Sequence, residues 1–153
     1  SVTICGNVCN AVGIALQSAT SFICLTPLSN ITGGSQSCNV VASAGNLEVT
    51  LSNGYTYNTS LTPSIITVSP ARGGTAGGTT VTVSGSQFGT TAGSVSVTID
   101  GSTCTVSYVT DTVIICVTSA HSGSIKAKVR VEVSGNGIAK QQDESQTFYY
   151  VDR

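Results

Sequence analysis

A cysteine-containing motif occurs twice in this chain, and the two copies lie 95 residues apart. The first copy, SVTICGNVC, occupies residues 1–9, and the second, VSVTIDGSTC, occupies residues 95–104, with Gly6 matching Gly101. Self-similarity at a fixed period indicates that both segments adopt the same supersecondary structure. The repeat therefore limits the fold to one kind of unit used twice.

The repeat continues beyond the motif and sets the expected domain organisation. A further cysteine follows each copy, Cys24 after the first and Cys116 after the second, and aromatic runs at residues 55–57 and 148–150 close the two units. We therefore expect a complete unit at residues 61–153 and a partial unit at residues 1–60. The partial unit has no counterpart of residues 63–93, so its opening strands are expected either in a longer chain, of which this sequence is a piece, or in a neighbouring molecule.

Apolar and polar residues alternate along several segments of the second unit, which is typical of half-buried β-strands. At residues 127–133 the small apolar side chains face one way and the charged side chains face the other. Seven strands are expected, near residues 65–69, 80–84, 95–99, 105–109, 112–117, 127–133 and 146–151. This pattern predicts a sandwich of two sheets. The linker at residues 58–63 is short, which predicts a stiff tandem of two such units.

The composition favours strands and excludes several classes of protein. Ser, Thr and Gly supply 61 of the 153 residues, and the 40% hydrophobic share is largely Val, Ile and Ala, as expected for strands and turns and not for disorder. Charged residues make up 8% and the net charge is −1, so no basic surface for nucleic acid is expected. No stretch supplies the roughly 20 apolar residues of a membrane helix, so no membrane insertion is expected.

An even number of cysteines indicates disulfide bonds and an oxidising compartment. They are Cys5, Cys9, Cys24, Cys38, Cys104 and Cys116, and fifteen pairings are possible. A zinc site is disfavoured because only Cys5 and Cys9 are close in sequence, and His121 has no ligand-like neighbour. Two sequons, at Asn30 and Asn58, predict N-glycans on surface loops of a secreted protein.

Several spaced segments of the second unit form a recognisable pattern. They are PSIITVSP at residues 63–70, GGTTVTVSG at residues 77–85, Phe88, the turn at residues 101–104, the Ile115-Cys116 pair and the closing FYY at residues 148–150. In this order they resemble the IPT/TIG domain family, and the first unit looks like the same domain from its third strand onward. The resemblance implies immunoglobulin-like sandwiches, as in plexin-like and fibrocystin-like extracellular proteins, where the domain is not generally the catalytic part. DNA-binding members of the family have basic loops, whereas the six bases here are scattered.

The resemblance also implies how the cysteines pair. It implies three bridges: Cys9–Cys24, Cys104–Cys116 and Cys5–Cys38. The first two correspond to the disulfide of extracellular members, and the third has no equivalent in the second unit, where Asp100 and about Lys128 stand in its place. In the chain-entropy account each short bridge contributes roughly 3 kcal/mol by constraining the unfolded chain. Reduction is therefore expected to loosen the fold.

No arrangement typical of an enzyme stands out in the sequence. The glycine-rich segment at residues 72–79 lacks the Gly-Lys-Ser/Thr ending of a phosphate-binding loop, so we interpret it as a turn. His121 lies close to Ser119 and Ser122, but a catalytic set would need a carboxylate such as Asp111 beside it, and nothing in the spacing favours that. We expect a solvated histidine in a loop.

The acidic and aromatic clusters favour structural interpretations as well. Asp143 and Glu144 lack the alternating oxygen-ligand spacing of a calcium loop, so a solvated turn is expected there. Tyr55, Tyr57 and residues 148–150 would suit a stacking platform for a sugar or a base, but packing on the core or at the junction of the units is favoured. The abundance of Ser and Thr fits O-glycosylation and strand formation equally well.

These observations favour a non-enzymatic structural repeat segment of a larger secreted or cell-surface glycoprotein, forming a stalk, a coat or an extracellular filament. The expected partners are neighbouring copies or adjacent repeats of the same protein and covalent glycans, with no cofactor, no metal and no nucleic acid. In a filament, strands of a neighbour would complete the partial unit by edge pairing. The alternative is a ligand- or carbohydrate-binding ectodomain module of a receptor or enzyme.

Overall fold

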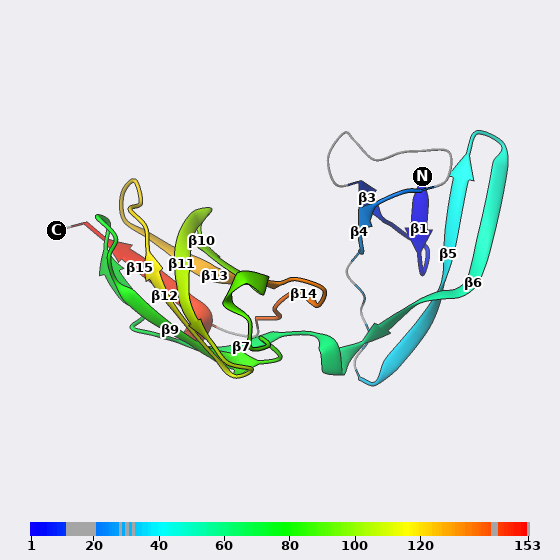
Figure 1. Ribbon diagram of the computed structural model, residues 1–153. Helices are drawn as coiled ribbons and strands as arrows, with labels where there is room; N and C mark the ends of the chain where they lie inside the picture. The colour runs from blue at the N-terminus through cyan, green and yellow to red at the C-terminus, as the bar shows by residue number, and fades with distance from the viewer. Residues whose placement is uncertain (12–20, 28, 30, 32, 142–143, 153) are drawn as a thin grey trace. The chain divides into compact units, whose positions relative to one another are not determined.

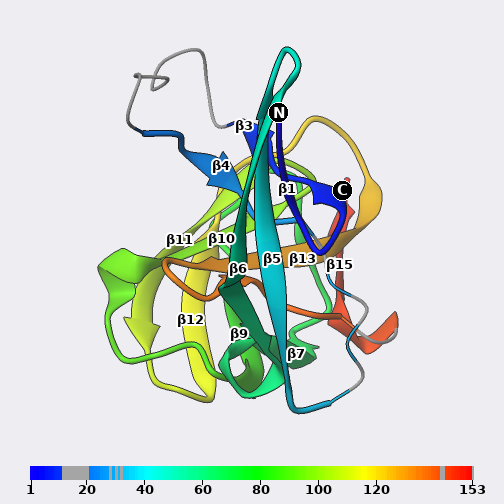
Figure 2. The same ribbon diagram turned by 90° about the vertical axis from the view of Figure 1, so that its right-hand side faces the viewer.

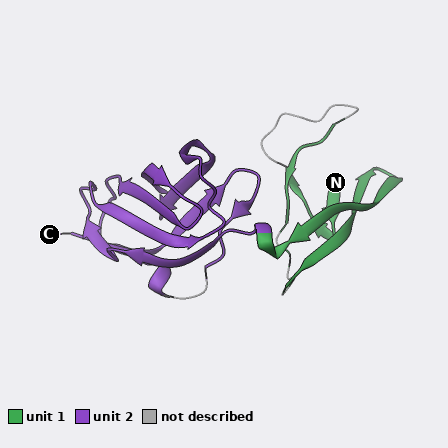
Figure 3. Ribbon diagram, turned by 60° about the horizontal axis from the view of Figure 1, so that its bottom comes forward, with its two compact units in different colours: residues 1–60 green, residues 61–153 purple. Residues whose placement is uncertain are grey.

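β-strands make up almost all of the regular structure, so the fold is all-β as expected. The computed structural model describes residues 1–11, 21–27, 29, 31, 33–141 and 144–152. The chain divides into two compact units, residues 1–60 and residues 61–153 (Figure 3). The helical turns of the described part are single 3₁₀ turns: η1 (Thr59–Leu61), η2 (Ala92–Ser94) and η3 (Glu144–Gln146).

The second unit contains all seven strands expected from the alternation of its side chains. These are β7 (Ser64–Ser69), β9 (Thr80–Ser86), β10 (Val95–Ile99), β11 (Ser102–Val109), β12 (Val113–Thr118), β13 (Ile125–Val133) and β15 (Thr147–Val151). Two short strands were not expected, namely β8 (Arg72–Gly74) and β14 (Gly137–Ile138). The strands follow one hydrogen-bonded path, β7-β9-β12-β11-β10-β13-β15-β8, with β14 on β13 (Figure 1). The ladders along this path are antiparallel except that β15 pairs with β8 in parallel.

Both halves of this path contribute to one core. Val81 and Val83 of β9 are fully buried, as are Val129 and Val131 of β13, and eighteen buried residues form the cluster. The outward side chains of β13 are exposed and charged: Lys126, Lys128, Arg130 and Glu132. The expected alternation is therefore confirmed, and burial of apolar side chains, at about 1.5–3 kcal/mol each, is the main stabilising term of this unit.

Tight turns set the strand registers of the second unit. Asp100 and Gly101 form a two-residue turn between Ile99 and Ser102, with φ of +47° and +77°. Positive φ at both central residues matches the twist of a hairpin, and an Asp-Gly pair tolerates it best. Since the turn joins β10 to β11 directly, it fixes which side chains of both strands face the core.

The first unit has a four-stranded antiparallel sheet in the order β2-β1-β5-β6 (Figure 2). Its strands are β1 (Val2–Ile4), β2 (Asn7–Val8), β5 (Ser35–Ala44) and β6 (Leu47–Asn58). A separate two-stranded ladder joins β3 (Asn10–Ala11) to β4 (Cys24–Leu25).

The buried core of the first unit is small. Among its described residues only Ile4, Cys9 and Cys38 form a buried cluster, with Val2, Cys24, Val40 and Tyr57 packed around it. Glu48 is the one charged side chain in residues 1–60. Two of the three buried residues are disulfide-bonded, so cross-links replace much of the hydrophobic burial that holds the second unit.

The glycine-rich segment predicts a graded stability series. Gly77 has φ +80°, and a Cβ added there would lie 2.6 Å from the carbonyl carbon of Ser119, whereas Gly78 has φ +78° and open space around it. We expect Gly77→Ala to lower the free energy of unfolding by about 2–4 kcal/mol and Gly78→Ala by about 1–2 kcal/mol, because only the first adds a backbone clash to the left-handed strain. Urea denaturation followed by circular dichroism measures both.

Gly93→Ala is the matched control for this series, because Gly93 has neither a positive φ nor a neighbour within 4 Å of an added Cβ. It should change the free energy of unfolding by no more than about 0.5 kcal/mol. Equal losses for all three variants would contradict the assignment of Gly77 to a close backbone approach.

Candidate functional site

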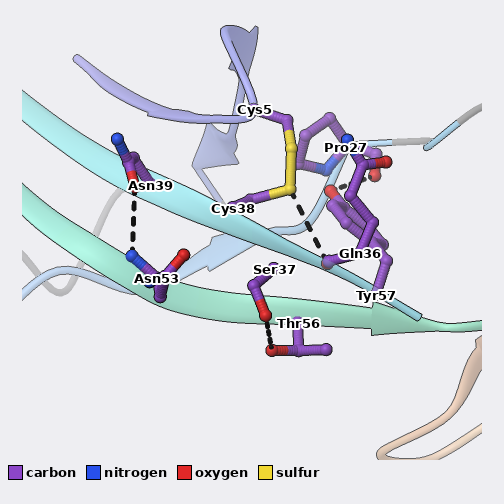
Figure 4. The surroundings of a disulfide bond; sticks show 9 residues. All are labelled: Cys5, Pro27, Gln36, Ser37, Cys38, Asn39, Asn53, Thr56 and Tyr57. Carbon is purple, nitrogen blue, oxygen red and sulfur yellow. Dashed lines mark hydrogen bonds between the residues drawn. A yellow bond between two sulfur atoms is a disulfide. The ribbon is translucent and has the colours of Figure 1, made fainter.

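Disulfide bonds are the most prominent chemical feature of both units. The six cysteines form Cys5–Cys38, Cys9–Cys24 and Cys104–Cys116, with Cα–Cα distances of 5.0, 5.6 and 5.4 Å. These are the pairs that the family resemblance implies. Figure 4 shows the first bridge, which ties the turn after β1 to β5.

The turn after the first strand of each motif has the same geometry in both units. Cys5 and Gly6 connect Ile4 to Asn7 with φ of +52° and +77°, as Asp100 and Gly101 do in the second unit with +47° and +77°. A cysteine at positive φ is unusual, since its Cβ is disfavoured there. The sequence match of Gly6 with Gly101 therefore corresponds to a shared backbone conformation.

The strand registers around the cysteines also agree between the units. Ala11 lies opposite Cys24 in the β3–β4 ladder, and Val106 lies opposite Cys116 in the β11–β12 ladder. In each case the first cysteine of the bridge precedes the paired apolar residue by two positions. The bridges Cys9–Cys24 and Cys104–Cys116 thus cross equivalent strand pairs.

A tyrosine in the closing strand of each unit makes an equivalent hydrogen bond. The hydroxyl of Tyr57 donates to the carbonyl of Pro27 at 2.7 Å, and the hydroxyl of Tyr150 donates to the carbonyl of Ser119 at 3.3 Å. Each acceptor lies three residues after the second cysteine of its bridge. The sequence predicted that these aromatic residues pack on the core or at the junction of the units, and it did not predict the hydrogen bonds.

Each of these tyrosines also packs edge-to-face against a second aromatic ring. Tyr57 and Tyr55 have ring centroids 4.9 Å apart, and Tyr150 and Phe148 have centroids 5.1 Å apart. Burial raises the pKa of the Tyr57 and Tyr150 hydroxyls above the ordinary value, and the neighbouring Tyr55 adds a smaller rise for Tyr57. Phe148 and Tyr150 lie in the core, whereas Tyr55 and Tyr149 are exposed.

The second unit has no cysteine pair equivalent to Cys5–Cys38, and the register corrects the residue that replaces Cys38. Cys38 lies opposite Tyr55, and in the second unit Ala127 lies opposite Phe148. Ala127, and not Lys128, is therefore the counterpart of Cys38. Side chains alternate along a strand, so the outward Lys128 could not take an inward position.

His121 is not a solvated side chain, contrary to the sequence-based expectation. Only 11% of the side chain is exposed, and the ring stacks on Tyr150 with centroids 4.8 Å apart. Nε2 lies 3.1 Å from Oδ2 of Asp100, and Nδ1 lies 3.0 Å from the carbonyl oxygen of Gly123. Both ring nitrogens therefore face oxygen acceptors, and the carboxylate beside the ring is Asp100 and not Asp111.

The remaining sequence candidates lie in separate places. Part of the glycine-rich segment forms β8 and not a turn, and the turn follows at Thr75 and Ala76, where the N–H of Gly77 donates to the carbonyl of Gly74 at 3.1 Å. Asp143 lies outside the described residues, and Glu144 begins η3. In the described ranges, no group of three His, Cys, Asp or Glu side chains is placed to hold a metal ion. None of the helices described is long and apolar enough to cross a membrane.

The structure describes the asparagine of one of the two sequons, Asn58. Asn30 lies outside the described residues. Asn58 is the last residue of β6, and its Oδ1 accepts hydrogen bonds from the backbone N–H of Ser60 at 3.0 Å and from the Ser60 hydroxyl at 2.8 Å. The asparagine and the hydroxyl that define this sequon are thus in direct contact.

Residues 63–150 match the IPT/TIG domain family. The chain belongs to that family. This IPT/TIG chain is also similar to fibrocystin-L, with 40% identity to the human protein and 36% identity to the mouse protein over 152 residues. Each match covers 99% of this chain and 4% of the relative. The chain therefore spans a small fraction of the length of these relatives.

A solved structure supports the immunoglobulin-like fold of the IPT/TIG chain. The extracellular region of plexin A4 matches 98% of this chain with a TM-score of 0.51 and 22% identity, and the match covers 14% of that protein. At this level of identity the likeness concerns the fold alone. The expected fold class, an all-β immunoglobulin-like sandwich, is confirmed for the matched domain.

Reduction is expected to affect the two units of this IPT/TIG chain differently. The first unit has three buried residues, two of them cysteines, whereas the second unit has an extensive apolar core besides Cys104–Cys116. Loss of one short bridge costs about 3 kcal/mol, within the roughly 5–15 kcal/mol of a typical domain. A mild reductant should therefore abolish amide-exchange protection in residues 35–58 while β9 and β13 stay protected.

The double variant Cys104→Ser/Cys116→Ser separates the effect of bridge loss on the second unit from its effect on the first, because it keeps both bridges of the first unit. Hydrogen exchange read by mass spectrometry should then show weaker protection in the second unit and unchanged protection in the first. Protection of residues 35–58 that survives complete reduction would contradict the dependence of the first unit on its cross-links.

The raised pKa of Tyr150 predicts a stability change at alkaline pH. In the unfolded chain the Tyr150 hydroxyl ionises near pH 10, whereas in the native state its pKa is higher. The neutral hydroxyl therefore stabilises the native state below about pH 10, and this stabilisation is lost as the pH rises further. Tyr150→Phe removes the hydroxyl, so it should be less stable than the parent at neutral pH, and the gap should narrow above about pH 10. Urea titrations at several pH values measure the gap, with the exposed Tyr149→Phe as control. A gap independent of pH would count against burial of the Tyr150 hydroxyl.

Proposed function

We propose that this chain is a non-enzymatic structural segment of a larger secreted or cell-surface glycoprotein, in which IPT/TIG units follow one another as a stalk, coat or filament. The observation that carries the proposal is the frame that both units share. Each has a positive-φ turn, a disulfide across equivalent strands and a tyrosine hydrogen bond to the residue three positions after the second cysteine. Such features hold strands together.

The shared frame supports a tandem in which residues 1–60 are part of a second IPT/TIG module. Sequence similarity to the family covers residues 63–150, so the assignment of the first unit rests on the strand registers and the tyrosine contact. These features involve side chains far apart in sequence. Their joint occurrence in both units is therefore better explained by a common fold than by chance similarity of short motifs.

An oxidising compartment is supported by the cross-links and by the relatives. In the described residues every cysteine is paired, and two bridges lie in a unit with little other buried surface. Disulfides that supply a large share of a domain's stability are typical of secreted and cell-surface proteins. The plexin A4 structure with the same fold is described as an extracellular region, which agrees with this assignment.

The side chains that most resemble catalytic groups are engaged in structure. His121 contacts Asp100, Gly123 and the Tyr150 ring, which favours a role in holding the loop after β12. A general base for a serine nucleophile would need one ring nitrogen directed at a hydroxyl. The contacts of His121 therefore support a structural role. We propose adjacent repeats and covalent glycans as the partners of this segment.

Secretion with an N-glycan on Asn58 tests the proposed function. The chain, expressed behind a secretion signal in eukaryotic cells, should leave the cell without free thiols and with a glycan on Asn58, since the sequon lies at the end of an exposed strand. Ser60→Ala should abolish this glycan because it removes the required hydroxyl, and Thr59→Ser should keep it. Glycopeptide mapping before and after N-glycosidase treatment gives the readout.

Retention inside the cell with free thiols, or secretion with Asn58 unmodified, would count against the proposal that this chain belongs to an extracellular glycoprotein. The binding alternative has its own signature. Saturable binding of a soluble ligand or a glycan, lost on substitution of the exposed Tyr108 or Tyr149, would replace the structural role with a recognition role.

A further inference from the structure

Four of the six basic side chains of this chain, although scattered in sequence, lie on one outer side of the second unit. Lys126, Lys128 and Arg130 alternate with inward side chains along β13, so they share its outward side. Arg72 joins them from β8, because Lys126 lies opposite Tyr149 of β15 and Tyr149 lies opposite Arg72. We call Arg72, Lys126, Lys128 and Arg130 the basic face. The strands β13 and β15, which carry most of it, are neighbours in Figure 2.

Burial shows that the row through Tyr149 points away from the core. Tyr150 is fully buried and lies opposite Gly73 of β8. Residues one position earlier on both strands, Tyr149 and Arg72, are exposed. Since successive side chains of a strand point to opposite sides of the sheet, Tyr149 and Arg72 face solvent together.

The basic face is a repeating array of charge along and across strands. Alternate residues of a strand are about 7 Å apart and neighbouring strands about 4.8 Å apart, so the four cations occupy roughly 13 by 10 Å of sheet. Ser96 and Thr98 of β10 extend the same side, because they lie opposite Glu132 and Arg130. Their hydroxyls can donate hydrogen bonds to anionic oxygens.

Positive charge dominates this side of the unit. Its strands β8, β10, β13, β14 and β15 contain a single acidic residue, Glu132, which accepts a hydrogen bond from Arg130 at 3.3 Å. Four positive charges and one negative charge leave +3, in a chain whose net charge is −1. The strands β7, β9, β11 and β12 contain no charged residue. Like charges gathered on one surface repel one another, and a polyanion lying on it would relieve that repulsion.

We propose that the basic face binds a linear sulfated polysaccharide through charge. The inference rests on the proposed function, which places this chain outside the cell. Sulfates that recur along a polymer complement cations that recur along β13, whereas a small anion would engage only part of the array. The guanidinium groups of Arg72 and Arg130 can each hold two oxygens of one oxyanion.

A sulfated polysaccharide is favoured over nucleic acid for two reasons. Disulfide-bonded chains belong to secreted compartments, and single-stranded nucleic acid is bound by several aromatic side chains on which successive bases stack. Of the aromatic residues in the strands that form this side, only Tyr149 is exposed. Attachment of a stalk or coat to a matrix polymer through charge adds to its structural role.

Heparin binding by the secreted, disulfide-bonded chain tests the inference. The parent should bind immobilised heparin at low salt, and its affinity should fall steeply as the salt concentration rises, because such binding releases counterions from the polymer. Heparin stripped of its sulfates should bind at least about tenfold more weakly. Surface plasmon resonance over a series of salt concentrations gives the affinity and its salt slope.

A matched pair of double variants makes the test specific. Arg72→Gln/Lys128→Gln removes two positive charges from exposed positions, so it should weaken binding about tenfold and reduce the salt slope by roughly two. Thr67→Glu/Thr80→Glu changes the net charge equally at exposed positions of β7 and β9 and should change the affinity by no more than about twofold. Glu132→Gln should strengthen binding about two- to threefold, because it removes the negative charge of this side. Unchanged urea midpoints and intact disulfides serve as folding controls.

Several outcomes would overturn the inference. They are absence of heparin binding at low salt, and equal losses for the two double variants, which would show a response to net charge and not to this face. Tighter binding to single-stranded DNA or to phosphatidylserine vesicles would assign the face to nucleic acid or to a lipid surface. Binding lost in Tyr149→Ala but kept in Arg72→Gln/Lys128→Gln would identify stacking on a sugar ring. Secretion and glycosylation do not depend on the basic face, so these outcomes leave the proposed function to its own test.

Discussion

The pairing of β10 with β13 presents a row of valine and isoleucine side chains on one side of the sheet, and the rest of the second unit depends on covering that row. Val97, Ile99, Val129 and Val131 are buried in the same cluster as residues of β7 and β9. The turns, the bridge and the closing tyrosine keep the two halves of the sandwich together around it. In the first unit the same row is present with fewer covering residues, so cross-links take a larger part in its stability.

The two units use different chemistry to fix the same turn. In the second unit Asp100, at the first turn position, contacts the His121 ring at 3.1 Å. In the first unit the same position is Cys5, which is bonded to Cys38 on β5. A side-chain hydrogen bond of this kind contributes about 0.5–1.5 kcal/mol, whereas a bridge closing a loop of this length contributes about 3–4 kcal/mol in the chain-entropy account. The stronger constraint occurs in the unit with the smaller apolar core, as expected if each unit must stay folded.

Sequence alone was sufficient for features with a local or periodic signal. The alternation of apolar and polar residues predicted the seven strands of the second unit, and the family resemblance implied the cysteine pairs. Contacts without such a signal were missed. The stacking of His121 on Tyr150 joins residues 29 positions apart, and β8 pairs through backbone atoms of a glycine-rich segment that shows no alternation. The counterpart of Cys38 was misplaced by one residue because the loops before it differ in length, and only strand pairing shows which side chains face inward.

The position of Asn58 bears on how neighbouring modules would associate. β6 is an edge strand of 12 residues with three exposed aliphatic side chains, an exposed tyrosine and a single charge, and such an edge favours pairing with strands of other molecules. Proteins protect edges of this kind with charges, prolines or covering groups. β6 has one charged residue and no proline. A glycan on Asn58, the last residue of β6, would hinder edge pairing there by its bulk and hydration. A glycan at this position would therefore favour modules joined end to end along one polypeptide over a fibre in which separate molecules exchange strands.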